Sequence, residues 1–297
     1  MEQIDRIAFI GFGEAGGILG AALAAQGVRV LMFDRLLDEP ERAPAMHEKA
    51  AEAGVHAAAT LPAAIDGAQI IVSAVTAASD AEVADATARC IAPGQTFLDI
   101  NSVSPRTKQY GQRCIEKVGG HYVEAAVMAP VPPYGLAVPM LLAGARAQVV
   151  AEQLRMFGAE ARAVSTQVGA ASAAKMCRSV MIKGIEALTV ECLSAARYYR
   201  AEGIVLASLQ ETFAKMQHDA DVPGYLISRV AEHGRRRAAE MREVAQTLRD
   251  AGIDPLMSEA CARRQDNLVD AMEALDIHYD ASTPFVWQNL LDALRAR

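Results

Sequence analysis

Residues 6–17 of the chain read RIAFIGFGEAGG. The apolar run predicts a buried strand, and the spacing Gly11-x-Gly13-x-x-Gly16 follows that strand directly and opens a helix. In this spacing Gly11 permits a tight turn, Gly13 lets the backbone approach a pyrophosphate, and Gly16 lets helix and strand pack closely. The helix N-terminus adds free N–H groups and a positive dipole end. The remaining residues of the predicted phosphate-binding turn are Phe12, Glu14 and Ala15.

The second predicted strand, residues 28–34, ends at Asp34, eighteen positions after Gly16. A carboxylate at this place binds the two hydroxyls of an adenosine ribose and repels a 2′-phosphate, which favours NAD over NADP. The neighbouring Arg35 favours the opposite choice, because a guanidinium accepts the extra phosphate. NAD is therefore the expected cofactor, with NADP open. A tight turn that binds no ligand is the weaker alternative.

The first 165 residues alternate short apolar runs with amphipathic segments. This alternation predicts a Rossmann-type, doubly wound parallel sheet with ligands at the carboxyl ends of its strands. The expected strands are 6–10, 28–34, 68–75, 96–100 and 122–127, and the expected helices between them are 15–26, 44–53, 80–90 and 105–118.

Residues 166–297 have a different sequence pattern, in which apolar residues recur at helical spacing and strand-like runs are not found. They predict an all-α second domain that begins with one long interdomain helix, residues 169–200. The further helices expected are 205–218, 225–251, 258–273 and 284–295.

Composition excludes several classes of protein. The 297 residues carry 29 basic and 36 acidic side chains, a net charge of −7, and the single basic block is Arg235–Arg237, so nucleic acid is not an expected partner. Five scattered cysteines form no metal-binding or disulfide pattern, and no metal is expected. No apolar run reaches the roughly 18–20 residues of a membrane span. A soluble cytoplasmic protein without a membrane partner is expected.

The second candidate region is KMCRSVMIKGIEAL, residues 175–188. Lys175, Ser179 and Glu186 are spaced so that they share one helix face. A lysine flanked by alanines and directed at a domain junction loses hydration, which lowers its pKa and suits it for general acid–base catalysis. From spacing alone, a solvated lysine is the stronger alternative.

The order of four sequence blocks favours a catalytic lysine over a solvated one. The blocks GFGEAG (11–16), DINSVSP (99–105), EAAVMAP (124–130) and KMCRS (175–179) resemble, in order and spacing, the β-hydroxyacid dehydrogenase family, which shares its fold with 6-phosphogluconate dehydrogenase. Within that family the chain is most similar to the branch with a distinctive helical C-terminal domain. The resemblance implies that Lys175 is the catalytic acid/base and that Asn101 and Ser102 lie beside nicotinamide and substrate. Val75 and Thr76 are expected along the cofactor.

Departures from the family pattern concern the substrate. The family's substrate loop usually carries a serine and two glycines that bind a carboxylate, whereas this chain has Met128, Ala129 and Pro130, followed by Tyr134. Methionine donates no hydrogen bond and proline has no N–H, so the resemblance implies a bulkier or less charged substrate that these four residues contact.

Two further positions differ. Ser179 replaces the asparagine that the family has four residues after the lysine, and it can still hydrogen-bond a substrate hydroxyl. The family's late Lys-Asp pair is replaced by Ala239-Glu240, and Arg236 is a possible substitute for its lysine. A solvated helix face is the stronger interpretation of the arginine run.

Together these observations predict an NAD(P)-dependent dehydrogenase or reductase that acts on a CH–OH group of a small molecule. Lys175 would serve as acid/base, and Ser102 and Ser179 would orient the hydroxyl. Two alternatives stay open: a reductase of an imine or a non-carboxylate ketone, and a nucleotide-binding protein without catalysis. The long apolar helix also predicts a homodimer or higher homo-oligomer, as in the family.

Overall fold

The computed structural model describes residues 4–218 and 220–296. The chain forms two compact units, one ending at Val180 and the other beginning at Met181. This division lies inside helix α7 (Ala170–Tyr198). The sequence predicted the change of domain between residues 165 and 166, shortly before that helix begins.

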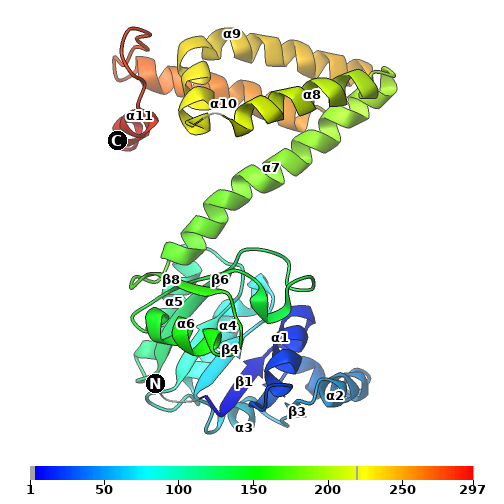
Figure 1. Ribbon diagram of the computed structural model, residues 1–297, viewed down its shortest axis with the longest axis vertical. Helices are drawn as coiled ribbons and strands as arrows, with labels where there is room; N and C mark the ends of the chain where they lie inside the picture. The colour runs from blue at the N-terminus through cyan, green and yellow to red at the C-terminus, as the bar shows by residue number, and fades with distance from the viewer. Residues whose placement is uncertain (1–3, 219, 297) are drawn as a thin grey trace. The chain divides into compact units, whose positions relative to one another are not determined.

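An eight-stranded sheet forms the centre of the first unit (Figure 1), with strand order β3-β2-β1-β4-β5-β6-β7-β8. Neighbouring strands are parallel except for the antiparallel pair β6–β7. The strands are β1 (Arg6–Ile10), β2 (Arg29–Phe33), β3 (His56–Ala57), β4 (Ile70–Ser73), β5 (Thr96–Asp99), β6 (His121–Val127), β7 (Met140–Ala143) and β8 (Ala161–Ser165). The predicted doubly wound fold is confirmed, with an antiparallel addition that the sequence did not predict.

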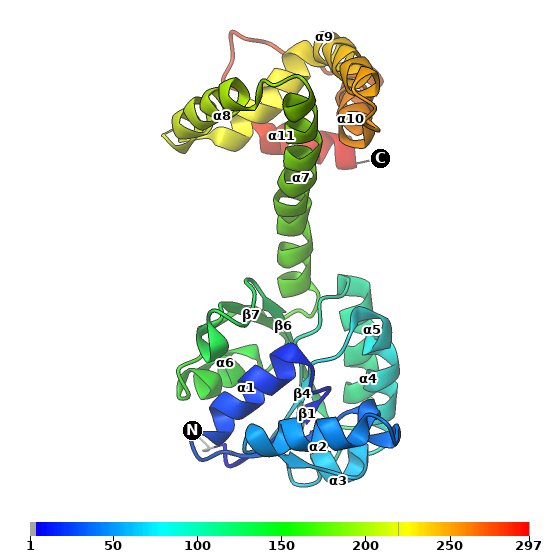
Figure 2. The ribbon, with the colours of Figure 1, turned by 90° about the vertical axis from the view of Figure 1, so that its right-hand side faces the viewer.

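Helices cover both faces of the sheet, as Figure 2 shows. Side chains of β1 alternate between the two faces: Ile7 and Phe9 pack with α1, α2 and α6, and Ala8 and Ile10 pack with the α3–α5 side. The helices are α1 (Glu14–Ala24), α2 (Ala43–Glu52), α3 (Leu61–Ile65), α4 (Asp80–Ala88), α5 (Pro105–Glu116) and α6 (Ala147–Arg155), with short 3₁₀ turns η1 (Arg35–Asp38), η2 (Ala77–Ser79) and η3 (Gly135–Ala137).

The carboxyl ends of the parallel strands bring distant segments to one edge of this sheet. Gly11 follows β1, Asp34 follows β2, Val75 comes shortly after β4, and Asn101 comes shortly after β5. In the strand register, Ile10 lies opposite both Phe33 and Ser73, so these three strands end level with one another. The topology therefore places the glycine-rich turn and the Asn101-Ser102 segment on the same edge.

Among the described residues of the second unit, helices are the only regular secondary structure. Besides the remainder of α7 it contains α8 (Glu202–Gln217), α9 (Val222–Asp250), α10 (Leu256–Glu273) and α11 (Trp287–Arg295). The arginine run lies on α9. Arg235 pairs with Asp270 (2.5 Å) and Glu273 (2.9 Å) of α10, and Arg236 pairs with Glu240. These ion pairs lie on the exposed surface of the helices, and the role of Arg236 beside a nicotinamide stays a prediction.

No helix within residues 4–218 and 220–296 has the length and apolar character that crossing a lipid bilayer requires.

Candidate active site

The three glycines of the turn have the geometry that their spacing predicts. Gly11 has φ +86°, and a Cβ there would lie 2.5 Å from the carbonyl oxygen of Ala74. A Cβ on Gly16 would lie 2.4 Å from the carbonyl oxygen of Gly11, so helix α1 could not approach the turn. A Cβ on Gly13 would meet no atom within 4 Å. Gly13 is therefore the glycine that borders open space, where a phosphate can approach.

Phe12 and Asp34 hold this turn from the inside. The Phe12 side chain is fully buried, so only its backbone is available to a ligand. The Phe12 N–H donates to Oδ2 of Asp34 at 2.8 Å, and the Leu36 N–H donates to Oδ1 at 3.0 Å. The Asp34 carboxylate thus ties the end of β2 to the glycine turn, in addition to any contact with a ribose.

A cavity of about 570 Å³ opens along this edge. It extends from the turn past Asp34 to helix α4, and two guanidinium groups, those of Arg35 and Arg42, line it. Of the residues predicted to bind cofactor, those that line it are Gly11, Gly13, Glu14, Asp34, Arg35, Val75 and Thr76. Its size and lining fit a dinucleotide phosphate and adenosine.

A second cavity of about 330 Å³ lies next to the first, and Val75 lines both. Its polar side chains are those of Asn101, Ser102 and Lys175. Apolar groups make up the rest of the wall: Ala15, Ala74, Val75, Ala77, Ile100, Val127, Ala129, Pro130 and Val131.

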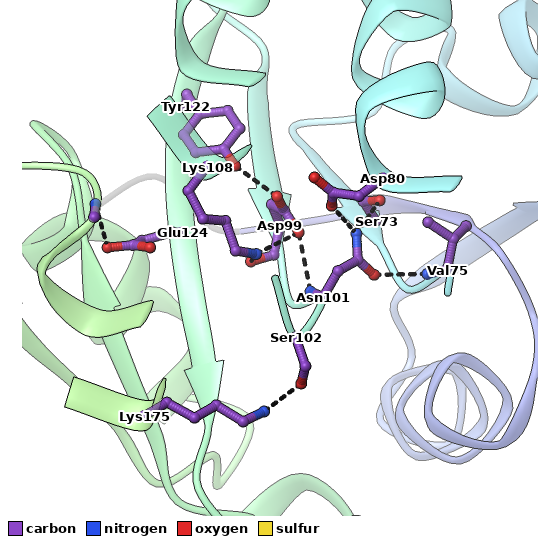
Figure 3. Close-up of polar contacts among 11 residues, drawn as sticks. Ser73, Val75, Asp80, Asp99, Asn101, Ser102, Lys108, Tyr122, Glu124 and Lys175 are labelled. Atoms are coloured by element: carbon purple, nitrogen blue, oxygen red, sulfur yellow. Dashed lines mark hydrogen bonds and ion pairs between the residues drawn. The ribbon is translucent and has the colours of Figure 1, made fainter. Parts of the chain in front are cut away.

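Lys175 and Ser102, 73 residues apart in the chain, meet at this second cavity (Figure 3). The Lys175 Nζ donates to the Ser102 Oγ at 2.5 Å, and the lysine is half-buried. Lys175 lies near the start of α7, which Glu124 anchors from β6. The fully buried Glu124 accepts the N–H groups of Gly169 (2.7 Å) and Ala171 (3.0 Å) through Oε1.

Asn101, predicted to contact the cofactor, has its side chain engaged within the protein. Its Oδ1 accepts the Val75 N–H at 2.7 Å, and its amide nitrogen donates to Ser73 Oγ (2.9 Å) and Asp80 Oδ1 (2.7 Å). Both amide hydrogens are therefore used. Asn101 joins the segments after β4 and β5, and so fixes the backbone on both sides of the two cavities.

Behind Asn101 lies a buried ionic cluster (Figure 3). Asp99 pairs with Lys108 at 2.6 Å and accepts the Tyr122 hydroxyl at 2.5 Å and the Asn101 N–H at 2.9 Å. Burial, and then the charge of Asp99, raise the pKa of Asp80 from 3.8 to about 6. Burial, reinforced by the charge of Asp99, also raises the pKa of the Tyr122 hydroxyl well above its usual range.

The structure brings some of the predicted substrate residues together and not others. Ala129, Pro130, Ser102 and Lys175 line the second cavity. Met128 packs against the small cluster of Ala126, Ala143 and Ala171, and Tyr134 is half-exposed in the following loop. Ser179 is one helical turn beyond Lys175 and partly buried. Contacts of Met128, Tyr134 and Ser179 with a substrate stay predictions.

Sequence reasoning missed Lys49, Asp80, Lys108 and Glu124 as members of this region. A charged residue inside an otherwise apolar run was the available signal for Glu124 in HYVEAAV, residues 121–127. Lys49, Asp80 and Lys108 lie on amphipathic helices, where a charge normally faces solvent, so nothing in the sequence distinguishes them. Groups of acidic, cysteine or histidine side chains that could hold a metal ion are not found among the described residues.

This topology, the glycine turn and the two adjoining cavities define the dinucleotide-binding class of α/β proteins. The family model described as the NAD binding domain of 6-phosphogluconate dehydrogenase matches residues 6–169, more than half of the chain, and a domain of unknown function (DUF1932) matches residues 196–268. The chain therefore belongs to the 6-phosphogluconate dehydrogenase family, as an NAD(P)-binding member of an oxidoreductase class with a hydroxyacid dehydrogenase-like fold.

Two similar solved structures share substantial sequence. A conserved hypothetical protein from Sinorhizobium meliloti is 37% identical, with 98% of this chain and 96% of that chain covered and a TM-score of 0.63. A conserved protein of unknown function, described as structurally similar to 3-hydroxyacid dehydrogenases, is 32% identical, with 89% and 97% covered and a TM-score of 0.60.

A third structure shares the fold alone. It is an imine reductase from Aspergillus terreus in complex with NADPH4 and dibenz[c,e]azepine, 17% identical, with 98% of this chain and 99% of that chain covered and a TM-score of 0.71.

Proposed function

We propose that the protein is an NAD(P)-dependent oxidoreductase that interconverts a CH–OH group and a carbonyl, with Lys175 as general acid and base. The observation that carries this proposal is the Lys175–Ser102 hydrogen bond at the wall of the second cavity, next to Val75, which also lines the dinucleotide cavity. An ammonium and a hydroxyl at this place are suited to move a proton at the substrate oxygen.

The cofactor fits the residues present. The open space at Gly13 and the free N–H groups at the start of α1 suit a pyrophosphate, and the adjoining cavity suits an adenosine. When bound, the nicotinamide supplies the hydride acceptor or donor.

The chain's own groups would handle the proton. In oxidation, Ser102 orients the substrate hydroxyl and the neutral Lys175 amine takes its proton, directly or through the Ser102 hydroxyl. In reduction, the ammonium returns the proton to the same oxygen. Asn101 holds the backbone on which Ser102 lies, so the Ser102 hydroxyl meets the substrate in one geometry.

Two arginines support NADP(H) as the preferred form of the cofactor. Arg35 and Arg42 both line the dinucleotide cavity, and two backbone N–H groups already bind the Asp34 carboxylate that would repel a 2′-phosphate. The complex of the imine reductase with NADPH4 adds to this support. Replacing both arginines with Ala should raise the Kd for NADPH at least tenfold and that for NADH less, in a fluorescence titration.

The apolar wall of the second cavity favours a second candidate substrate. Val127, Ala129, Pro130 and Val131 offer little to a carboxylate, and the imine reductase has the same fold. Reduction of an imine or of a ketone without a carboxylate is therefore the alternative reaction for the same lysine.

A substrate screen with one variant tests the proposal. Wild type should oxidise hydroxy acids or alcohols with NADP⁺ or NAD⁺, or reduce ketones or imines with NADPH or NADH, and the panel tells the two reactions apart. Lys175→Met should lower kcat by about 10²-fold or more while the cofactor Kd changes little, because general acid–base catalysis contributes on that scale. Replacement of the exposed Lys117 by Met is the matched control. Full turnover by Lys175→Met would contradict the assignment, and tight NADPH binding without turnover on any substrate would favour a non-catalytic protein.

A further inference from the structure

Lys49 of α2 reaches the glycine turn from outside the fingerprint. Its Nζ donates to the carbonyl oxygens of Phe12 and Gly13, both at 2.8 Å. The ammonium also lies 5.7 Å from the centroid of the buried Phe12 ring. A cation held by two carbonyl groups and an aromatic face has a defined position, unlike a solvated lysine.

The peptide on each side of Phe12 is thereby held by a charged side chain. On one side, Asp34 accepts the Phe12 N–H; on the other, Lys49 binds the Phe12 carbonyl. Asp34 follows β2 and Lys49 lies on α2, so two separate elements lock the turn before any ligand binds. Gly17 leaves the room for this, because a Cβ there would lie 3.1 Å from the Cε of Lys49.

The orientation of two N–H groups follows from these bonds. In a trans peptide the N–H points opposite to the preceding carbonyl. Since the carbonyls of Phe12 and Gly13 point at Lys49, the N–H groups of Gly13 and Glu14 point away from it. Gly13 and Glu14 are residues that line the dinucleotide cavity.

Charge gives Lys49 a second effect. Glu14 begins α1 and lines the same cavity, so its carboxylate repels an incoming pyrophosphate. The Lys49 ammonium, fixed on the neighbouring carbonyl of Gly13, offsets that repulsion.

We propose that Lys49 is a positioning residue for the dinucleotide: it holds the glycine turn in the shape that presents the N–H groups of Gly13 and Glu14 to the pyrophosphate, and it compensates the charge of Glu14. This inference rests on the dinucleotide binding of the proposed function, and it is independent of the role of Lys175.

Fragment binding tests the proposal. NADPH and ADP-ribose contain a pyrophosphate, whereas adenosine 2′-monophosphate does not. Lys49→Met should raise the Kd for NADPH and ADP-ribose about tenfold or more, and the Kd for adenosine 2′-monophosphate less than twofold, in isothermal titration. Lys49→Arg keeps the charge and should restore most of the affinity, and Lys117→Met should bind like wild type.

Each other outcome contradicts the proposal. Equal loss of affinity for all three ligands would indicate a merely structural role of Lys49. In that case the melting temperature of Lys49→Met should also fall, whereas that of Lys49→Arg should not. Unchanged NADPH affinity in Lys49→Met would remove the role altogether. If wild type and Lys49→Met bind NADPH equally tightly while Lys175→Met loses turnover, the proposed function stands and the inference about Lys49 fails. Wild type that binds no dinucleotide would overturn both.

Discussion

At the scale of single residues, Asp80 is a buried carboxyl group whose surroundings clearly raise its pKa. It shares a buried site with Asp99, and one ammonium, that of Lys108, faces the two carboxyl groups. Asp99 also receives hydrogen bonds from Tyr122 and from the Asn101 N–H, so Asp99 is the better-stabilised anion. The proton therefore goes to Asp80, which explains why its pKa is raised to about 6.

The raised pKa of Asp80 predicts an unusual dependence of stability on pH. Folding raises this pKa from 3.8 to about 6, so the native state binds the proton more tightly than the unfolded state does. The stabilisation is fully present below about pH 4 and is lost as the pH rises through about 6. Asp80→Asn keeps an acceptor oxygen for the Asn101 amide, but its side chain does not titrate in this pH range. From pH 4 to 7 we expect the unfolding free energy of this variant to rise relative to wild type by about 1–2 kcal/mol, after allowance for solvent screening.

Urea denaturation at several pH values between 4 and 7 measures this difference. Asp66→Asn, at an exposed position, is the control and should track wild type at every pH. A difference between Asp80→Asn and wild type that is the same at all pH values would contradict the raised pKa.

The role of a single residue can be predicted from the sequence when it depends on neighbours that are close along the chain. The roles of Gly11 and Gly16 follow from the spacing of strand, turn and helix, and the structure gives them the expected close contacts. The engagement of Asn101 with Asp80 joins residues 21 apart through a sheet edge, and the binding of Lys49 to the turn spans 36 residues or more. Such contacts depend on tertiary packing, to which no local pattern points.

At the scale of elements, the start of α7 depends on one buried carboxylate. Glu124 Oε1 accepts two backbone N–H groups at that end of the helix, and its charge interacts favourably with the helix dipole. In the described residues its Oε2 has no hydrogen-bond partner, so the two N–H bonds are what stabilise the buried charge. Because Lys175 follows within two turns, Glu124 sets where its ammonium lies.

Removing this cap should loosen the first turns of α7. Glu124→Ala should lower the unfolding free energy by about 2 kcal/mol or more, because it leaves buried N–H groups unpaired, and Glu124→Gln should cost less. Hydrogen exchange should accelerate at amides 170–175 in Glu124→Ala. Glu116→Gln, at an exposed site on α5, is the control. Exchange in this segment as slow as in wild type would contradict a capping role.

The sequence predicted the strands that form apolar runs and the amphipathic helices that lie between them. Each of the five expected strands and four expected helices of the sheet region has a counterpart. The sequence missed β3, β7, β8, α3 and α6. Strand β3 has only two residues, and β8 is an edge strand in which only Ala161 is buried. Neither strand therefore contains an apolar run long enough to be recognised in the sequence. Strand β7 pairs antiparallel with β6, which the β–α alternation did not anticipate.

At the scale of the whole molecule, the second unit leaves large apolar side chains exposed. Val190 of α7 is 69% exposed, and Ile204 and Phe213 of α8 are 78% and 52% exposed. Single exposed apolar residues are ordinary, but a series of them along two consecutive helices is typical of a surface that another chain covers. A second copy of this chain is the partner we expect, since closed homo-oligomers are the commonest assemblies.

Sedimentation equilibrium tests this expectation directly. Wild type at micromolar concentration should have at least twice the mass of the 31.6 kDa chain. Replacing Val190 and Ile204 together with Lys should shift the protein toward monomer, because two charges would have to lose their hydration in the interface. Gln210→Lys, which adds a charge at an exposed polar position of α8, should leave the mass unchanged. Since Val190 and Ile204 line neither of the two cavities, NADPH affinity should persist in the monomer. A wild type that sediments as a monomer would contradict self-association, and would require another partner to cover these side chains.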